Sequence, residues 1–498
     1  MSKMTSRVAS YLSGLQIGGY GISDAAGGFV NYLLDSYFHK VDARFLEANK
    51  DREYVPGDLD AHIRELWLGC EIHKAITINQ SFPAYLKAQT AWAFTRLLNS
   101  YVGAGGSYDA VNVLDSYQYK EALKNHFSYK LQSSQLEIAY GVQVTMPVFG
   151  VFFLSRVSDG KRIVVDIDIC YDRSACSFKV MAGPADQALV EEFFADLHHS
   201  MMVNDIYRNK CLTFERGVLG FQKIRTTTWE DVIIKPDLRD RIRKNSVGLL
   251  NNIEALTSIG FPAKRNCLLI SPPGMAKTTM FRAISNELEG NTTRIWCTGK
   301  SIEYPEHVSA LFEAARGLAP CILFIEDMDL FGADRSMGGG RNYVLNEFLA
   351  QLDGTGSNAG IVVLASTNDF QSMDEALTNR PGRFNDKIII PLPDADERNQ
   401  MLQKFFKSYG ARLSPSITQE IWMSVIDLTD GFTGDYIREV VDTAVLYAAD
   451  AGRCQGKNVM LEADDLVKSG TRTIENYDIG KQAKKHIVDI TVSPQLGS

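Results

Sequence analysis

The chain has 498 residues, of which 45% are hydrophobic and only 15 are proline, so it is long enough for two to four domains with sizeable cores. Its 52 basic and 60 acidic residues give a net charge of −8, which disfavours bulk nucleic-acid binding. The eight cysteines include no C-x-x-C pair and no nearby His at zinc-ligand spacing, which favours buried thiols in a reducing compartment. We expect a cytoplasmic protein without a membrane anchor, since the first residues contain no apolar core of signal-peptide length and the run MPVFGVFFL is too short to span a bilayer.

Residues 1–133 are predicted to form a mostly helical domain. The segments FVNYLLDSYFH and YLKAQTAWAFTRLLNSYV repeat apolar residues at three- and four-residue spacing. Their interior aromatic residues favour a hydrophobic core over a ligand-binding box.

Residues 134–222 are predicted to form a small α+β domain. Its strands are LEIAYGVQVTMPVFGVFFLSR, KRIVVDIDICY and CSFKVMAG, and a helix follows at about 186–203. Alternation places Asp166 and Asp168 on one strand face, where they either bind a metal or, as we favour, lie on a solvated surface. The adjacent His198 and His199 favour a surface position over a ligand role.

Residues 223–397 alternate strands with helices, and this order predicts an open parallel sheet. Ligands of such sheets bind at the carboxyl ends of the strands, which is where the phosphate-loop candidate, the Glu326-Asp327 pair and Asn368 fall. Helical spacing returns in residues 398–472, which predicts a compact helical subdomain. Residues 473–498 are expected to be a loosely held tail.

The segment NCLLISPPGMAKTT, residues 266–279, combines an apolar run, a Gly/Pro-rich turn and a helix start. Backbone N–H groups in such a loop can wrap a phosphate, with Lys277 contacting its oxygens and Thr278 contacting Mg²⁺. Ser271 and Ala276 stand where the G-x-x-x-x-G-K-[ST] pattern has glycines, and a positive φ at Ala276 would cost about 1 kcal/mol or more. Taken alone, the segment is equally compatible with a plain strand-turn-helix.

A second segment, CILFIED, ends an apolar strand in two acids about fifty residues later. One carboxylate at this position can steady Mg²⁺, and the other can orient or deprotonate an attacking water. The two segments together favour nucleotide hydrolysis.

The chain resembles the AAA+ ATPases, specifically the AAA clade, from about Thr226 to Arg472. The resemblance rests on WEDV, SPPGMAKTT, FIEDMD, LNEFLAQLDG, VLASTND, ALTNRPGRF, PLPDADER and GFTGDYI, in that order. It implies an α/β P-loop NTPase fold with a parallel-sheet AAA+ core at 223–397 and a C-terminal helical lid at 398–472. The N-terminal helical domain and the small α+β domain would precede it.

The resemblance also implies roles for individual residues, with ATP and Mg²⁺ as cofactors. The nucleotide-binding set is Asp231, Val232, Ile233, Pro273, Gly274, Met275, Ala276, Lys277, Thr278 and Thr279. Thr278 and Glu326 would bind the metal. The catalytic set is Glu326, Asp327, Asn368, Arg380 and Arg383, of which the two arginines would act as fingers in the site of a neighbouring subunit. A homo-oligomeric ring, usually a hexamer, is implied.

Three features depart from the family pattern. The altered phosphate loop is one, and the Glu-Asp order at 326–327 is another; that order is similar to the mitochondrial AAA translocase that moves the folded Rieske protein. In the segment expected to face the pore, Tyr304 is the one aromatic residue and Pro305 follows it.

The leading hypothesis is an ATP-hydrolysing ring that remodels a protein client recognised by residues 1–222. The alternative is a nucleotide-gated scaffold or signalling ATPase with slow turnover. A third hypothesis, an enzyme within the first 220 residues, has no catalytic constellation to support it.

Overall fold

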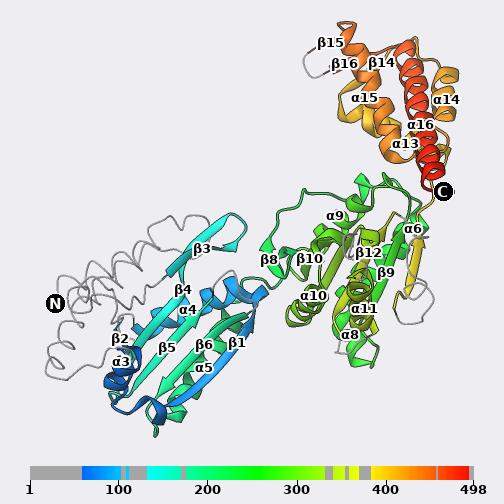
Figure 1. The fold of residues 1–498 in the computed structure, drawn as a ribbon. Coiled ribbons are helices and arrows are strands. Elements are labelled where there is room, and N and C mark those ends of the chain that lie inside the picture. Colours follow the sequence, from blue (N-terminus) through cyan, green and yellow to red (C-terminus); the bar gives the residue numbers. More distant parts are fainter. Residues whose placement is uncertain are drawn as a thin grey trace, which may run out of the picture. The chain divides into compact units, whose positions relative to one another are not determined.

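The computed structural model describes residues 59–102, 108–111, 132–169, 175–330, 340–353, 358–368, 383–455 and 458–492. The chain divides into two compact units (Figure 1). The first comprises residues up to Arg208 together with Gly217–Lys223, and the second comprises Asn209–Arg216 and the chain from Ile224 onward.

The first unit is built on an antiparallel sheet in the order β1-β6-β5-β4-β2, with β3 also paired to β4. Its strands are β1 (Ile76–Pro83), β2 (Tyr108–Val111), β3 (Gln132–Ala139), β4 (Val142–Arg156), β5 (Arg162–Asp168) and β6 (Ala175–Ala182). Its helices are α3 (Leu59–Leu68), η1 (Ile72–Lys74), η2 (Ala84–Leu86), α4 (Lys87–Val102) and α5 (Gln187–Val203), and the short strand β8 (Val218–Phe221) belongs to the same unit.

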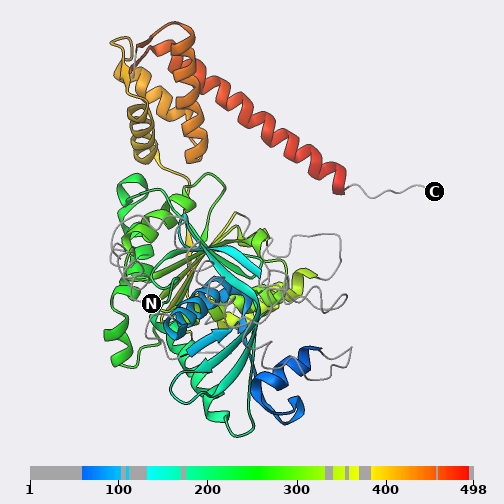
Figure 2. The ribbon, with the colours of Figure 1, turned by 90° about the vertical axis from the view of Figure 1, so that its left-hand side faces the viewer.

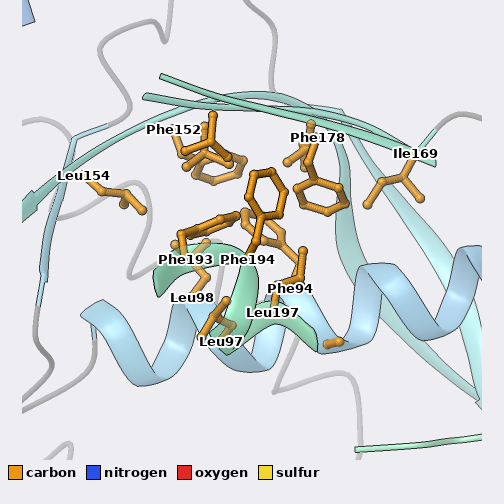
Figure 3. Packing of buried hydrophobic residues seen from close by; sticks show 14 of the residues in the cluster. Phe94, Leu97, Leu98, Phe152, Leu154, Ile169, Phe178, Phe193, Phe194 and Leu197 are labelled. Carbon is orange, nitrogen blue, oxygen red and sulfur yellow. The ribbon is translucent and has the colours of Figure 1, made fainter. Parts of the chain in front are cut away.

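Helices α4 and α5 pack on one face of this sheet (Figure 3). Phe94 of α4 lies 5.2 Å from Phe152 and 5.5 Å from Phe178, measured between ring centroids, and Phe193 of α5 is in the same cluster. Because side chains alternate along a strand, Phe153 points to the opposite face, where it packs against Trp67 of α3. The aromatic residues therefore form the core on both faces, as expected.

The prediction that residues 1–133 form a separate, mostly helical domain differs from this arrangement. Strand β1 pairs with β6 along its whole length, and α4 packs beside α5, so the described residues on both sides of position 133 share one core. The segment ITINQSFP has the period-two alternation of a half-buried strand, and this was the missed signal. The helical segment predicted at FVNYLLDSYFH lies outside the described residues.

On the predicted acidic face of β5, Asp166 forms an ion pair with Arg64. Asp166 accepts hydrogen bonds from the buried guanidinium of Arg64 at 2.7 and 2.8 Å, which ties α3 to the sheet. Within the described ranges, no cluster of three His, Cys, Asp or Glu side chains could hold a metal.

The second unit contains the predicted parallel sheet, which this structure confirms. From β13 to β7 the strands of this sheet follow the order β13-β9-β12-β11-β10-β7, and each neighbouring pair among these six is parallel. The strands are β7 (Cys211–Glu215), β9 (Arg265–Ile270), β10 (Thr293–Thr298), β11 (Cys321–Glu326), β12 (Ile361–Thr367) and β13 (Asp386–Ile389). The helical segments are η3 (Trp229–Asp231), α6 (Pro236–Arg243), η4 (Lys244–Gly248), α7 (Leu249–Asn251), α8 (Ile253–Ser258), α9 (Lys277–Glu287), η5 (Gly299–Ser301), α10 (Pro305–Gly317), η6 (Met328–Leu330) and α11 (Gly340–Asp353).

Strands β9, β11 and β12 are buried almost throughout, which is the usual state of a parallel sheet covered on both faces. Strand β7 was not predicted. It precedes the expected boundary at residue 223, yet it pairs with β10 from Cys211 to Thr213.

The lid has its own core and follows β13. Its elements are α13 (Ala395–Ser408), β14 (Ala411–Leu413), α14 (Gln419–Leu428), α15 (Gly434–Asp450), β15 (Cys454–Gln455), β16 (Asn458–Leu461) and α16 (Ala463–Val492). Figure 2 shows α16 as a long helix. Thr473 is buried, and Ile474 and Tyr477 pack against the lid core, so the lid extends beyond residue 472 where a loose tail was expected. No helix in the described part of the chain has the length and apolarity of a membrane span.

Candidate nucleotide-binding site

The phosphate-loop candidate connects β9 to α9, as the sequence predicts. Gly274 has φ +80° and Ala276, the N-cap of α9, has φ +56°, so both lie in the left-handed region. Glycine adopts this region without strain, whereas alanine brings its Cβ too close to the following carbonyl oxygen. Ala276 is therefore a strained residue at the turn that starts the helix.

Lys277 is buried at the first position of α9, and all of its hydrogen-bonding capacity is used. Its Nζ donates to the Asn368 Oδ1 at 2.7 Å, to the Ser271 Oγ at 2.8 Å, and to the carbonyl oxygens of Ser271 and Pro272 at 3.1 and 3.2 Å. Burial lowers the pKa of the Lys277 ammonium, and the nearby carboxylates of Asp327, Asp329 and Glu326 oppose that shift. A cation thus lies at the mouth of the loop, next to three acids.

Glu326 is the last residue of β11, and one of its carboxylate oxygens has no hydrogen-bond partner. The Thr278 hydroxyl bonds to the Glu326 side chain, while the Glu326 Oε1 is buried without a hydrogen-bond partner. Desolvation raises the pKa of Glu326. A buried carboxylate oxygen beside a hydroxyl is a donor set that suits Mg²⁺, so the two residues fit the predicted metal role.

Asp327 is connected to the lysine through Asn368. The Asn368 Nδ2 donates to the Asp327 Oδ1 at 2.8 Å, and Asp327 itself has φ +50°. The predicted residues Lys277, Asn368 and Asp327 therefore form one hydrogen-bonded chain across the carboxyl ends of β11 and β12.

Sequence reasoning missed Asp329. Its Oδ1 accepts from the Thr367 hydroxyl at 3.0 Å and from the Asn368 backbone N–H at 3.1 Å, which fixes the end of β12 against the turn after β11. The third acid of FIEDMD was the available signal.

An apolar pocket lies beside the loop, and of the predicted nucleotide-binding residues at 231–233 only Ile233 lines it. The pocket is small and partly open to solvent, and its lining consists of Ile233, Ile234, Lys235, Leu238, Met275, Ile390, Pro391, Pro393, Glu397 and Met401. Val232 is buried in the core of the sheet unit instead. Asp231 accepts from the Thr228 N–H and pairs with Lys404 of the lid at 3.1 Å, and these hydrogen bonds lower its pKa.

The lid also contacts the phosphate loop directly. The Asp435 N–H donates to the Gly274 carbonyl at 3.3 Å. A Cβ added at Gly274 would lie 2.8 Å from the Thr433 Oγ1 and 2.9 Å from the Asp435 Oδ2. The close approach of the lid therefore requires glycine at this position.

The remaining loop residues of the predicted set are less enclosed. Met275 is buried, Thr279 is half-buried on α9, and Pro273 is exposed.

Arg383 pairs within its own chain, and Arg380 lies outside the described residues. The Arg383 guanidinium is buried and donates to the Asp353 carboxylate, with Nη2 3.1 Å from Oδ2. Its finger role in a neighbouring subunit remains a prediction.

Tyr304, the pore candidate, is the N-cap of α10 and is 59% exposed. Its ring packs edge-on against His307 at 5.4 Å.

The segment that contains this site is similar to a known protein family. A family model described as "ATPase family associated with various cellular activities (AAA)" matches residues 267–392. The ATP-dependent zinc metalloprotease FTSH 5, chloroplastic, of Arabidopsis thaliana is 33% identical over 250 residues, which cover 48% of this chain and 34% of that protein. The ATP-dependent zinc metalloprotease FtsH of Pirellula staleyi is 32% identical over 268 residues, which cover 51% of this chain and 37% of that protein. The chain thus spans little more than a third of the length of these relatives.

Proposed function

Because this chain is an AAA+ ATPase, with ATP and Mg²⁺ as its cofactors, we propose that it works as an ATP-driven ring that remodels a protein client. Residues 1–222 would recognise the client. The observation that supports turnover most strongly is the hydrogen-bonded chain from Lys277 through Asn368 to Asp327, beside the orphan oxygen of Glu326.

Each residue of this site has a task that its chemistry allows. ATP supplies the phosphoryl group that is transferred to water. Lys277 would exchange its present acceptors for phosphate oxygens, and Thr278 and Glu326 would hold Mg²⁺. Asp327 would orient the attacking water and accept its proton, while the Asn368 amide keeps that carboxylate in place.

The adenine of ATP would bind at the apolar pocket lined by Ile233, Met275 and Met401. Since Met401 comes from the lid and Met275 from the phosphate loop, occupancy of this pocket would couple lid position to nucleotide. We do not propose the zinc protease activity that the names of the relatives state. The match is confined to about a third of their length, and the eight histidines of this sequence form no H-E-x-x-H motif.

A ring would complete the site with arginines from a neighbour. Ring formation is supported by the family, whose members are generally oligomeric, and by the NRPGR segment that holds Arg380 and Arg383. A hexamer is the ring size we propose.

The alternative is a nucleotide-gated scaffold with slow turnover. The fully engaged Lys277 ammonium favours it, since a phosphate must displace some of the acceptors of this side chain, which can slow or weaken the nucleotide cycle.

Steady-state ATP hydrolysis distinguishes the two functions. A remodelling ring should hydrolyse ATP at a rate that falls at least a hundredfold in Asp327→Asn, while the affinity for ATP stays within a few-fold. A wild-type rate no higher than that of Asp327→Asn, with tight ATP binding in both, would favour the scaffold.

Client remodelling needs a second experiment. The Asp327→Asn protein with ATP should retain a client that Lys277→Ala, which cannot bind nucleotide, does not retain. The purified client should then raise wild-type turnover; a captured protein that leaves turnover unchanged and is itself unaltered by ATP would contradict remodelling.

A further inference from the structure

Ser271 occupies the position where the phosphate-loop pattern has its first glycine, and its side chain is part of the site. It is only 4% exposed. Its Oγ accepts a hydrogen bond from the Lys277 Nζ at 2.8 Å and donates to the Pro272 carbonyl at 3.0 Å. The hydroxyl is therefore satisfied on both sides, and its orientation toward the lysine is fixed.

The lysine has more acceptors around it than protons. An ammonium donates three hydrogen bonds, whereas four acceptors lie within 3.2 Å of Nζ. The two shortest contacts are to side chains, Asn368 at 2.7 Å and Ser271 at 2.8 Å. The two carbonyl contacts, to Ser271 and Pro272, are longer.

Glycine at position 271 would keep both carbonyls and remove the hydroxyl. The nucleotide-free lysine would then lose one of its two closest partners, although its burial would be the same. A phosphate oxygen must displace some of these acceptors when it binds, and each good acceptor in the free state lowers the net gain from binding. The serine thus acts against nucleotide affinity while it stabilises the free loop.

We propose that Ser271 is a positioning residue that holds Lys277 in the nucleotide-free loop and thereby sets the affinity for nucleotide. This inference rests on the proposed function only in assuming that the loop binds nucleotide. It gives the altered loop pattern a role: the serine is a competing ligand of the phosphate-binding lysine.

Ser271→Ala tests the proposal, because it removes the hydroxyl and keeps the Cβ. ATP and ADP dissociation constants are measured by calorimetry in the Asp327→Asn background, where turnover does not interfere. We expect both nucleotides to bind about tenfold more tightly, and the melting temperature without nucleotide to fall. Ser246→Ala is the matched control, since its buried Oγ donates only to the Ile242 carbonyl at 2.7 Å, and its affinity should stay at the reference value.

A double-mutant cycle separates the contact with Lys277 from a general effect on the loop. Without nucleotide, Ser271→Ala should lower the melting temperature in the Lys277 protein but not in Lys277→Ala. An equal loss in both backgrounds, or an unchanged or weaker affinity in Ser271→Ala, would overturn the proposal. Failure of the reference protein to bind any nucleotide would instead contradict the proposed function.

Discussion

Ala276 can strain the phosphate loop without lowering the affinity of the loop for its ligand. Its φ of +56° is already present in the nucleotide-free structure, so the cost of about 1 kcal/mol is borne on folding and not on binding. The strain therefore lowers the free energy of unfolding and leaves the binding free energy of the nucleotide largely unchanged.

We predict that Ala276→Gly raises the free energy of unfolding of the ATPase unit by up to about 1 kcal/mol, because glycine adopts this φ freely. The affinity for ATP should stay within a few-fold if the bound loop has the same backbone. Chemical denaturation with and without ATP measures both quantities. A tenfold gain in affinity at unchanged stability would mean that the strain arises only when nucleotide binds.

Gly299 packs against the turn that carries Asp327, the proposed catalytic acid. A Cβ added there would lie 2.3 Å from the Asp327 carbonyl oxygen and 3.2 Å from Leu330, so the turn after β11 would have to move. That turn also holds the Asp327 carboxylate against Asn368.

Gly299→Ala should therefore lower kcat at least tenfold while the ATP dissociation constant changes little, because small displacements of a catalytic group are costly. Gly317→Ala at the end of α10 is the control, since its added Cβ has no atom within 4 Å. Normal turnover in Gly299→Ala would show that the turn adapts without moving the acid.

At the scale of elements, the lid and the phosphate loop meet at Gly274. Two independent ion pairs also join the lid side to the segment before α6: Lys404 with Asp231 at 3.1 Å, and Asp394 with Lys235 at 3.1 Å. Both pairs are largely exposed and contribute little each, so the backbone approach at Gly274 is the more specific contact.

Gly274→Ala is expected to disrupt this contact, since its Cβ would collide with Thr433 and Asp435 in addition to the strain at φ +80°. Gly431→Ala has a similar φ of +74° but nothing within 4 Å, so it isolates the backbone strain alone. ATP-induced thermal shifts should be lost in the first variant and kept in the second. Equal losses in both would assign the effect to strain, not to the lid.

The sheet and the position of the acids were predictable because continuous apolar strands ending in polar residues leave few alternatives. The partners of Asp231 and Arg383 were not predictable. Lys404 lies far along the chain from Asp231, and Asp353 lies thirty residues before Arg383, so no local pattern relates them. The sign of φ at Ala276 and the contact between Ser271 and Lys277 likewise depend on the folded loop.

At the scale of the whole molecule, substitution of Arg380 and Arg383 distinguishes a site shared between subunits from one formed within a single chain. The buried pair between Arg383 and Asp353 gives Arg383 a structural role in its own chain. If both arginines also act in a neighbour, then Arg380→Ala and Arg383→Ala should each reduce turnover about a hundredfold with ATP affinity nearly unchanged. Asp353→Ala should destabilise the unit, since it removes the carboxylate that accepts hydrogen bonds from the buried Arg383 guanidinium.

Mixed assemblies provide the decisive measurement. Inactive Arg380→Ala subunits combined with inactive Asp327→Asn subunits should recover part of the activity, because one kind of interface then holds an intact site. Native mass measurement must show that mixed rings have formed. Absence of recovery in such rings would contradict fingers supplied in trans, provided that rings with wild-type subunits retain activity.

Strand β7 has a practical consequence for cutting the chain. It precedes β8, which belongs to the first unit, yet it pairs with β10 in the sheet of the second. The Arg294 N–H donates to the Lys210 carbonyl at 2.9 Å beside it. A recombinant ATPase fragment that begins at residue 224 would therefore expose the edge of β10, and exposed edges promote aggregation. A fragment that begins at Asn209 keeps this strand, and we expect it to remain soluble on its own.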